Sequence, residues 1–138
     1  KAGYQLAASR LRLDAPVEYN VNMPSVFGDD YSSVRELLTS ESRPSAMIVC
    51  DDILAVALER ICSEIGLSIP DDLSIISFNN SLFAKLTSPQ LTSIDINTAQ
   101  LGIEAASQII NHIENPNLLA TKIIVPHFIV ERNSCRQI

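Results

Sequence analysis

Basic charge and glycine are both scarce in this chain of 138 residues. Ten Lys and Arg residues stand against 16 Asp and Glu residues, which gives a formal net charge of −6 at pH 7. Proteins that bind nucleic acid usually carry an extended basic surface, so we expect that these residues do not hold DNA themselves. The 4 glycines are scattered, at positions 3, 28, 66 and 102. Phosphate-binding loops need closely spaced glycines, so nucleotide binding by such a loop is not expected.

The chain also has few cysteines and no long apolar segment. Its 3 cysteines, Cys50, Cys62 and Cys135, form no C-x-x-C pair, which argues against a disulfide framework and against a zinc site. No run reaches the roughly 18 apolar residues that a membrane-spanning helix needs, and the first residues lack the pattern of a signal peptide. We expect a cytoplasmic protein with reduced thiols, no cofactor, no metal and no membrane partner. Because the sequence opens at Lys1 inside a helical pattern, we expect it to be a piece of a longer protein.

Sequence signatures of catalysis are missing as well. The chain has neither a G-x-S-x-G nucleophile elbow nor an H-E-x-x-H zinc motif. His112 and His127 fall on different predicted elements without a neighbouring nucleophile, so each is interpreted as a surface or packing residue. We therefore expect no enzyme activity.

What the chain does have is a 46% hydrophobic composition and enough length for one domain or a large part of one. Its apolar spacing predicts that short strands alternate with helices. Strands are expected at 17–22, 46–50, 73–78, 91–96, 122–125 and 127–130, and helices at 2–13, from Asp29 or Asp30 to before Pro44, from Asp51 or Asp52 to Gly66, and from Asn97 to before Pro116. This order predicts an α/β fold with a mainly parallel sheet and right-handed crossovers. No strand precedes the first helix, so the sheet is expected to be incomplete.

For three of these elements, the sequence also predicts burial, capping or an apolar face. The run 46–50 is short and continuously apolar, as in a parallel strand that is buried on both faces. Asn97 and Gln100 have the spacing of a capping-box variant that opens the last long helix. The helix that ends at Gly66 should present one broad apolar face, and the last helix an apolar stripe. The face comprises Ile53, Leu54, Ala57, Leu58, Ile61 and Ile65, and the stripe comprises Leu101, Ala105, Ile109 and Ile113.

Two polar clusters directly follow predicted strands. Asp51 and Asp52 come after the strand at 46–50, and Asn79-Asn80-Ser81 comes after the strand at 73–78. In open parallel sheets, ligands bind beyond the carboxyl ends of the strands, and carboxylate and amide groups can hydrogen-bond neighbouring hydroxyls. One Asp is enough to cap the following helix, which leaves the other for a ligand. The asparagine cluster fits a ligand contact and an ordinary turn equally well.

Aromatic residues make up only 5% of the chain. Phe27 and Phe83 both fall in predicted loops, where an aromatic ring can stack on a sugar or pack against the edge of the core. Ser25 lies close to Phe27 in the sequence and is uninformative by itself.

Several motifs occur together in the order and at the spacing of one known family. They are P-S-A-M-I-V-C-D-D-I-L-A at 44–55, G-L-S-I-P-D-D-L-S-I-I-S-F at 66–78, S-P-Q-L-T-S-I at 88–94, L-G at 101–102 and E-R-N-S at 131–134. From about Tyr31 to Ser134, the chain closely resembles the C-terminal core of the lactose-repressor (LacI/GalR) family of transcriptional regulators.

The resemblance implies a three-layer, doubly wound core of the periplasmic-binding-protein-like type I, in which two subdomains close around a small effector. Residues 1–96 would belong to the C-terminal subdomain, 97–121 would be a returning segment of the N-terminal subdomain, and 122–138 would supply closing strands of the C-terminal subdomain. The family forms homodimers and contacts operator DNA through an N-terminal helix-turn-helix, which is absent from these residues.

The resemblance also implies ligand-binding residues. Asp51 matches a pocket position that hydrogen-bonds effector hydroxyls. Asn79 matches a position that is usually Asp, so this chain lacks one carboxylate there. Ser25 aligns near the pocket aromatic of the family, with Phe27 two residues away. The pocket Arg of the family would lie three residues before Gly3, outside this chain.

Two further features follow from the resemblance. Val56, Phe83 and Leu86 lie on segments that match the dimer interface of the family. The segment S-F-N-N-S at 77–81, followed by L-T-S-I-D-I at 91–96, is similar to maltose-operon repressors of Gram-positive bacteria. A maltose-like effector is therefore expected.

Two alternatives remain open from the sequence. In a response-regulator receiver, Asp51 and Asp52 would hold Mg²⁺ beside Asp95 as the phosphate acceptor, but too little chain follows Asp95 to complete that fold. An exported sugar-binding protein of the same fold would transport its ligand rather than regulate transcription, and the lack of disulfides argues against it.

Overall fold

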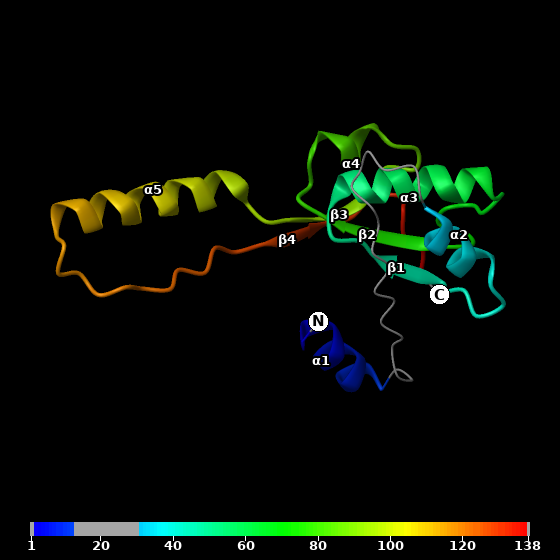
Figure 1. The fold of residues 1–138 in the computed structure, drawn as a ribbon, viewed down its shortest axis with the longest axis horizontal. Coiled ribbons are helices and arrows are strands. Elements are labelled where there is room, and N and C mark those ends of the chain that lie inside the picture. The colour runs from blue at the N-terminus through cyan, green and yellow to red at the C-terminus, as the bar shows by residue number, and fades with distance from the viewer. Residues whose placement is uncertain (1, 13–30, 138) are drawn as a thin grey trace.

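Figure 1 shows a computed structural model of the chain, in which residues 2–12 and 31–137 are described. The predicted strand at 17–22, the capping residues Asp29 and Asp30, and the candidate residues Ser25 and Phe27 lie outside the described residues. The elements are α1 (Ala2–Leu11), α2 (Ser32–Thr39), β1 (Ala46–Ile48), α3 (Asp52–Glu64), β2 (Ser74–Phe78), α4 (Leu82–Leu86), β3 (Thr92–Asp95), α5 (Thr98–Glu114) and β4 (Phe128–Val130).

Within the described residues, four strands form one sheet in the order β1-β2-β3-β4. The first three run parallel, and Ser77 on β2 lies opposite Ser93 on β3. The fourth strand runs antiparallel to β3, with Ile129 opposite Ile94. The α/β fold with a mainly parallel sheet that the sequence predicts is therefore confirmed.

The core lies between this sheet and the helices that cover one face of it. Side chains alternate between the two faces of a strand, and on β2 only Ile75 and Ser77 are buried, whereas Ile76 and Phe78 are half-buried. The core cluster draws its other members from α2, α3, α4 and the loops beside them. Helices α2, α3 and α4 thus form a helical layer against the sheet.

Helix α3 is the main helical contribution to the core. Its buried apolar residues are Ala55, Leu58, Ile61 and Cys62. Most of the predicted apolar face meets the core: Leu58 and Ile61 are buried in it, and Leu54, Ala57 and Ile65 pack against it. Ile53 is the exception, because it is 39% exposed. Apolar residues occupy more than half of the circumference of α3, so periodicity alone cannot tell which part of that surface meets the sheet.

Strand β1 is shorter and more exposed than predicted. The strand expected at 46–50 ends at Ile48, which is 59% exposed. β1 lies at the edge of the sheet, with β2 as its neighbour among the described strands. The prediction of burial on both faces is thus wrong within the described structure, because an apolar run does not reveal what lies beside it. Val49 is the buried residue here, and its N–H donates to the carbonyl of Ile76 at 2.9 Å.

Helix α5 stands at the end of an arm, away from the sheet (Figure 1). The apolar stripe predicted for it is present, but none of its residues is buried, and Ile109 and Ile113 are 62% and 73% exposed. The capping box is wrong. Asn97 at the N-cap has a left-handed backbone with a φ of 54° and no side-chain capping bond. The amide of Gln100 instead donates to Glu104 one turn later, at 2.8 Å.

The return from α5 contains one strand rather than two. The strand predicted at 122–125 is irregular in the structure, and Ile124 is 76% exposed. A strand needs a neighbour to satisfy its backbone groups, and the chain meets one only where Phe128–Val130 pairs with β3.

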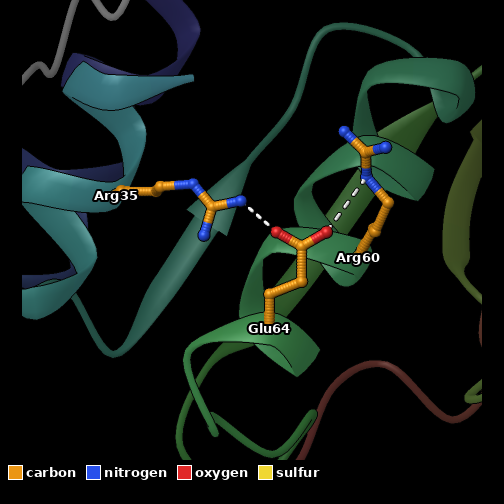
Figure 2. Close-up of polar contacts among 3 residues, drawn as sticks. All are labelled: Arg35, Arg60 and Glu64. Carbon is orange, nitrogen blue, oxygen red and sulfur yellow. Dashed lines mark hydrogen bonds and ion pairs between the residues drawn. The ribbon is translucent and has the colours of Figure 1, made fainter. Parts of the chain in front are cut away.

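An exposed cluster of charges joins α2 to α3 (Figure 2). Arg35 on α2 donates a hydrogen bond to Glu64 near the end of α3, and Arg60 lies 3.7 Å from the same carboxylate group. The guanidinium of Arg60 also lies over the ring of Tyr31, 5.6 Å from its centroid, where the ring attracts the cation. Exposed ion pairs of this kind contribute little stability, so the contact orients α2 more than it stabilises the fold.

Candidate functional site

The two candidate binding residues within the described structure follow neighbouring strands. Asp51 comes shortly after β1, and Asn79 follows β2 directly. These strands are parallel and adjacent, so their carboxyl ends lie at the same edge of the sheet, where ligands bind in folds of this type.

Asp51 is the N-cap of α3. Its Oδ1 accepts a hydrogen bond from the backbone N–H of Leu54 at 2.8 Å, which satisfies one of the N–H groups that a helix start leaves without a partner. The side chain is only half-buried. Its other oxygen, Oδ2, accepts no hydrogen bond from the rest of the described chain and can receive one from a ligand hydroxyl.

Asp52 has a different role from its neighbour, because it is 1% exposed and lies beneath the strand ends. Its Oδ1 accepts hydrogen bonds from the hydroxyls of Ser77, at 2.6 Å, and Ser93, at 2.8 Å. Its Oδ2 accepts a hydrogen bond from the backbone N–H of Ser81 at 2.6 Å. One carboxylate thus fastens α3 to β2, to β3 and to the start of α4.

These donors also determine the charge state of Asp52. Burial on its own raises the pKa of this carboxyl, but the hydrogen bonds from Ser77, Ser81 and Ser93 outweigh burial. The pKa therefore lies below its usual value, and Asp52 is a fixed negative charge at the start of α3, where the helix dipole favours one. Because both oxygens are occupied by donors from the chain, Asp52 is not placed to hold Mg²⁺ as the receiver alternative requires.

Asn79 and Asn80 form the turn that leaves β2. Both have positive φ angles, of 94° and 46°, in the left-handed region that asparagine tolerates better than other residues with side chains. The N–H of Asn79 donates to the carbonyl of Ile94 at 2.9 Å, so its backbone continues the pairing of β2 with β3. Its side chain is exposed and has no hydrogen-bond partner elsewhere in residues 2–12 and 31–137. That side chain is available to a ligand.

Asn80 is half-buried, and both ends of its side-chain amide bind other parts of the chain. Its side-chain Nδ2 donates to Asp95 Oδ2 at 2.9 Å, and its Oδ1 accepts a hydrogen bond from Arg132. The hydrogen bond from Asn80 holds the pKa of Asp95 below its usual value. Asp95 is thus engaged by the chain itself, which also argues against its being a phosphate acceptor.

The C-terminal motif E-R-N-S places two side chains against the sheet. Ser134 is fully buried, and its hydroxyl donates to the carbonyl of Ile75 at 2.6 Å and accepts from the N–H of Thr92 at 2.8 Å. It therefore bridges β2 and β3 just where their own pairing begins. Arg132 donates through Nη1 to the carbonyl of Leu91 at 2.6 Å. The Arg and the Ser of this motif both secure strands that lead to the candidate site.

The predicted interface residues lie on α3 and α4, which pack against each other. Phe83 and Leu86 are 48% and 71% exposed, and Leu82 beside them is 67% exposed. We call these three residues the α4 apolar patch. Val56 is half-buried and packs against the core cluster, so it offers less surface than the other predicted residues.

Ser77, Ser93 and Arg132 support the site and were not predicted to do so from the sequence. Serines in an apolar strand are a signal, because a buried hydroxyl needs a hydrogen-bond partner. Ser77 and Ser93 are such residues, on neighbouring strands, and the unassigned member of the Asp51-Asp52 pair is the carboxylate that receives both hydroxyls.

Within residues 2–12 and 31–137, no group of three or more His, Cys, Asp and Glu side chains is placed to hold a metal ion. In the same residues, no helix is both long and apolar enough to cross a membrane.

Comparison with known proteins gives consistent matches. A family model described as a periplasmic binding protein-like domain matches residues 1–135. The ribose operon repressor of Haemophilus influenzae is 33% identical over 115 residues, which cover 83% of this chain and 35% of that protein. The structure of a transcriptional regulator LacI from Bacillus cereus subsp. cytotoxis has 36% identity and a TM-score of 0.72, with 75% of this chain and 37% of that chain covered.

A third similar protein has a ligand. It is a LacI family transcriptional regulator from Enterococcus faecalis, solved with bound ribose, which has 31% identity and a TM-score of 0.70 over 76% of this chain and 39% of that chain. Across these three proteins, the chain spans between 35% and 39% of their length. All three are described as regulators of transcription and none as an enzyme or a receiver domain.

Proposed function

We propose that the effector of this chain, which belongs to the periplasmic-binding-protein-like domain family and forms part of the effector-binding core of a lactose-repressor (LacI) family regulator, is a small sugar. The observation that carries the proposal is the placement of Asp51 and Asn79 at the ends of two adjacent parallel strands. A carboxylate oxygen accepts hydrogen bonds, whereas a side-chain amide both donates and accepts. Together they suit hydroxyls on neighbouring carbons of a sugar ring.

The identity of the sugar is the finer part of the proposal. The motif S-F-N-N-S supports a maltose-like effector, whereas the relatives from H. influenzae and E. faecalis are described with ribose. Both are neutral and rich in hydroxyls, which agrees with an amide at Asn79 in place of a second carboxylate. Ser25 and Phe27 are proposed as further contacts on the same ligand.

We propose that the sugar acts by bridging two subdomains. In this proposal 1–96 and 122–138 belong to one subdomain, and 97–121, which includes α5, belongs to the other. Contacts made only in the closed state shift the population toward closure. The homodimer passes this change to an N-terminal helix-turn-helix beyond this chain, which alters affinity for operator DNA in the cytoplasm. No covalent step is required.

The α4 apolar patch supports the homodimer part of the proposal. Phe83 and Leu86, one helical turn apart, present their side chains to solvent, and Val56 lies on α3, the helix against which α4 packs. Exposed apolar groups on adjoining helices are typical of a surface that another subunit covers.

Calorimetry on the full-length regulator tests the sugar site. D-ribose and maltose are titrated separately into the wild-type protein and into the Asp51→Ala and Asn79→Ala variants. Loss of one hydrogen bond to a buried hydroxyl costs roughly 1 to 3 kcal/mol, so each variant should bind the preferred sugar about 5-fold to 150-fold more weakly. Asp71→Ala, at an exposed acidic residue on a distant turn, is the control.

The result that refutes the site is unchanged affinity in both variants. Binding of neither sugar by the wild-type protein, with a purine or another small molecule binding instead, would refute the sugar proposal. The exported sugar-binding protein remains the alternative function. Finding a signal peptide in place of a helix-turn-helix upstream of Lys1 in the full-length protein would favour it.

A further inference from the structure

Asn80 connects the candidate effector site to two distant parts of the chain. Its backbone N–H donates to the hydroxyl of Ser93 at 3.0 Å, which links it to the hydrogen-bond network of Asp52. Its side chain meets Asp95 on one side and Arg132 on the other. These two partners are far apart in sequence. Asp95 ends β3, the strand from which the chain leaves the sheet for α5, and Arg132 follows β4, the strand by which it returns. We call these two positions the chain crossings.

The first of these segments leaves the sheet at the end of β3. Asp95 is the last residue of that strand, and its Oδ1 accepts a hydrogen bond from the N–H of Asn97 at 2.7 Å. Asn97 has a left-handed backbone and begins α5. One carboxylate group therefore holds both Asn80, through Oδ2, and the turn into the arm, through Oδ1.

The second segment returns from the arm through β4 (Figure 1). Arg132 follows this strand, and its backbone N–H donates to Thr92 Oγ1 at 3.0 Å while Nη1 donates to the carbonyl of Leu91. Arg132 is thus fixed to the beginning of β3, and its Nη2 is the group that reaches Asn80.

Asparagine is chemically suited to this position. A carboxylate such as Asp95 only accepts hydrogen bonds, and a guanidinium such as Arg132 only donates them. The Asn80 amide donates from Nδ2 to the first and accepts at Oδ1 from the second. Aspartate would repel Asp95, and alanine would leave both charged groups without this partner.

From these contacts we propose that Asn80 is a positioning residue. It couples the Asn79-Asn80 turn, which lies at the candidate effector site, to both chain crossings. The inference rests on the proposed effector site, because Asn79 is the adjacent residue and shares the left-handed turn. Contact between a ligand and Asn79 shifts the backbone of Asn80, and its side-chain hydrogen bonds carry that shift to both crossings. The angle between the sheet and α5 therefore depends on occupancy of the site.

The first test needs no ligand. Amide hydrogen exchange is measured on the full-length, sugar-free regulator and on its Asn80→Asp and Asn80→Ala variants. Both variants change the hydrogen bonds of the Asn80 side chain to Asp95 and Arg132. Because these two residues hold the N–H groups of Asn97 and of Arg132 in place, exchange at both N–H groups should rise at least about tenfold. Buried amides of β2 should keep their wild-type rates. A rise at one crossing only, or at neither, would overturn the proposal.

The second test exchanges the two side chains. In the double variant N80D/D95N, the amide at position 95 can donate to the carboxylate at position 80, which still accepts from Arg132. With D-ribose and maltose as probes in calorimetry, Asn80→Asp should bind the preferred sugar roughly tenfold more weakly, and the double variant should recover to within about threefold of wild type. A double variant as weak as Asn80→Asp would refute the coupling.

The outcomes separate this inference from the sugar proposal. Asn133→Asp is the matched control, because it adds the same charge at an exposed residue next to Arg132. If the wild-type protein binds neither sugar, the sugar proposal fails while the exchange result still decides the coupling. If Asn80→Asp does not fold, Asn80→Ala and the double variant provide the exchange result.

Discussion

Ser77 donates its hydroxyl to the carboxylate of Asp52 at 2.6 Å, and neither residue is more than 1% exposed. This hydrogen bond joins the middle of the sheet to the first turn of α3. Asp51, the preceding residue, caps the same helix from a half-buried position. Two successive aspartates therefore have different roles. The helix directs Asp52 toward the sheet, whereas Asp51 remains half-buried at the helix start.

Removing the buried carboxylate should destabilise the protein strongly. In Asp52→Ala, donors from Ser77, Ser81 and Ser93 lose their acceptor, and we expect the free energy of unfolding to fall by roughly 2 to 4 kcal/mol. Urea denaturation of the full-length protein measures this. Asp71→Ala, at an exposed turn, should change it little. A loss below about 1 kcal/mol would contradict the role of Asp52.

The same carboxylate should make the fold sensitive to acid. Its pKa in the folded protein lies below the ordinary value of 3.8, so its stabilising effect is present above that value and is lost as the pH falls through the folded-state pKa. In Asp52→Asn, this component of the acid dependence should be absent. If the curves of stability against pH for the wild type and for Asp52→Asn stay parallel below pH 4, Asp52 does not contribute to the acid sensitivity.

Glu59 on α3 should give the stability of the fold a pH dependence of opposite sign. Burial raises the pKa of this carboxyl to about 7, and the nearby hydroxyl of Thr87 only partly offsets the effect of burial. The folded state thus retains a proton that the unfolded chain releases near the ordinary value of 4.5. Stability from this group is complete below that value and falls as the pH rises to about 7.

Denaturation at pH 5 and pH 7.5 tests the effect of Glu59. The wild-type protein should lose stability between these conditions relative to Glu59→Gln, whose side chain does not titrate. Glu36→Gln, at an exposed residue of α2, is the control and should follow the wild type. Equal pH dependence of all three proteins would show that Glu59 is not protonated in the folded state.

Ser134 should be sensitive to loss of its hydroxyl. In Ser134→Ala, the carbonyl of Ile75 and the N–H of Thr92 lose a fully buried partner, which costs roughly 1 to 3 kcal/mol in the free energy of unfolding. Ser88→Ala, at an exposed residue before β3, should have almost no effect. Thermal unfolding that ranks the two variants equally would contradict the bridging role of Ser134.

Charge on the α4 apolar patch should weaken self-association. Phe83→Glu and Leu86→Glu would each place a carboxylate in the proposed interface, and the desolvation cost should raise the dimer dissociation constant at least tenfold. Sedimentation of the full-length regulator measures it, with Ser63→Glu on the exposed surface of α3 as the control. Dimers as tight as wild type in both variants would place the interface elsewhere.

The order and type of the elements could be predicted because they depend on local periodicity. The strand before Asp51 and the helix after it follow from an apolar run and an amphipathic pattern, and the family follows from motifs in order. Burial of that strand could not be predicted, because Ile48 looks the same at a sheet edge as in its centre. The apolar stripe on α5 could likewise be predicted. Its exposure could not, because the sequence pattern does not show that the described residues leave the stripe uncovered.

The hydrogen-bond network around Asp52 could not be predicted from the spacing of residues in the sequence. Ser77 and Ser93 reach Asp52 from positions 25 and 41 residues away, and only the fold brings them together. The Asp51-Asp52 pair predicted that one residue caps the helix but not which one, because a shift of the helix start by one residue would exchange their roles. The cap expected at Asn97 failed because its backbone is left-handed, which periodicity does not reveal.

Because β3 and β4 are antiparallel neighbours, the chain leaves the sheet and re-enters it side by side. Everything between them, including α5, is attached through a two-stranded stem. Loop-closure entropy rises only slowly with length, so the sheet would tolerate long or short segments between the ends of that stem. Segments of different length between Asp95 and Phe128 should therefore leave the register of β3 with β4 unchanged.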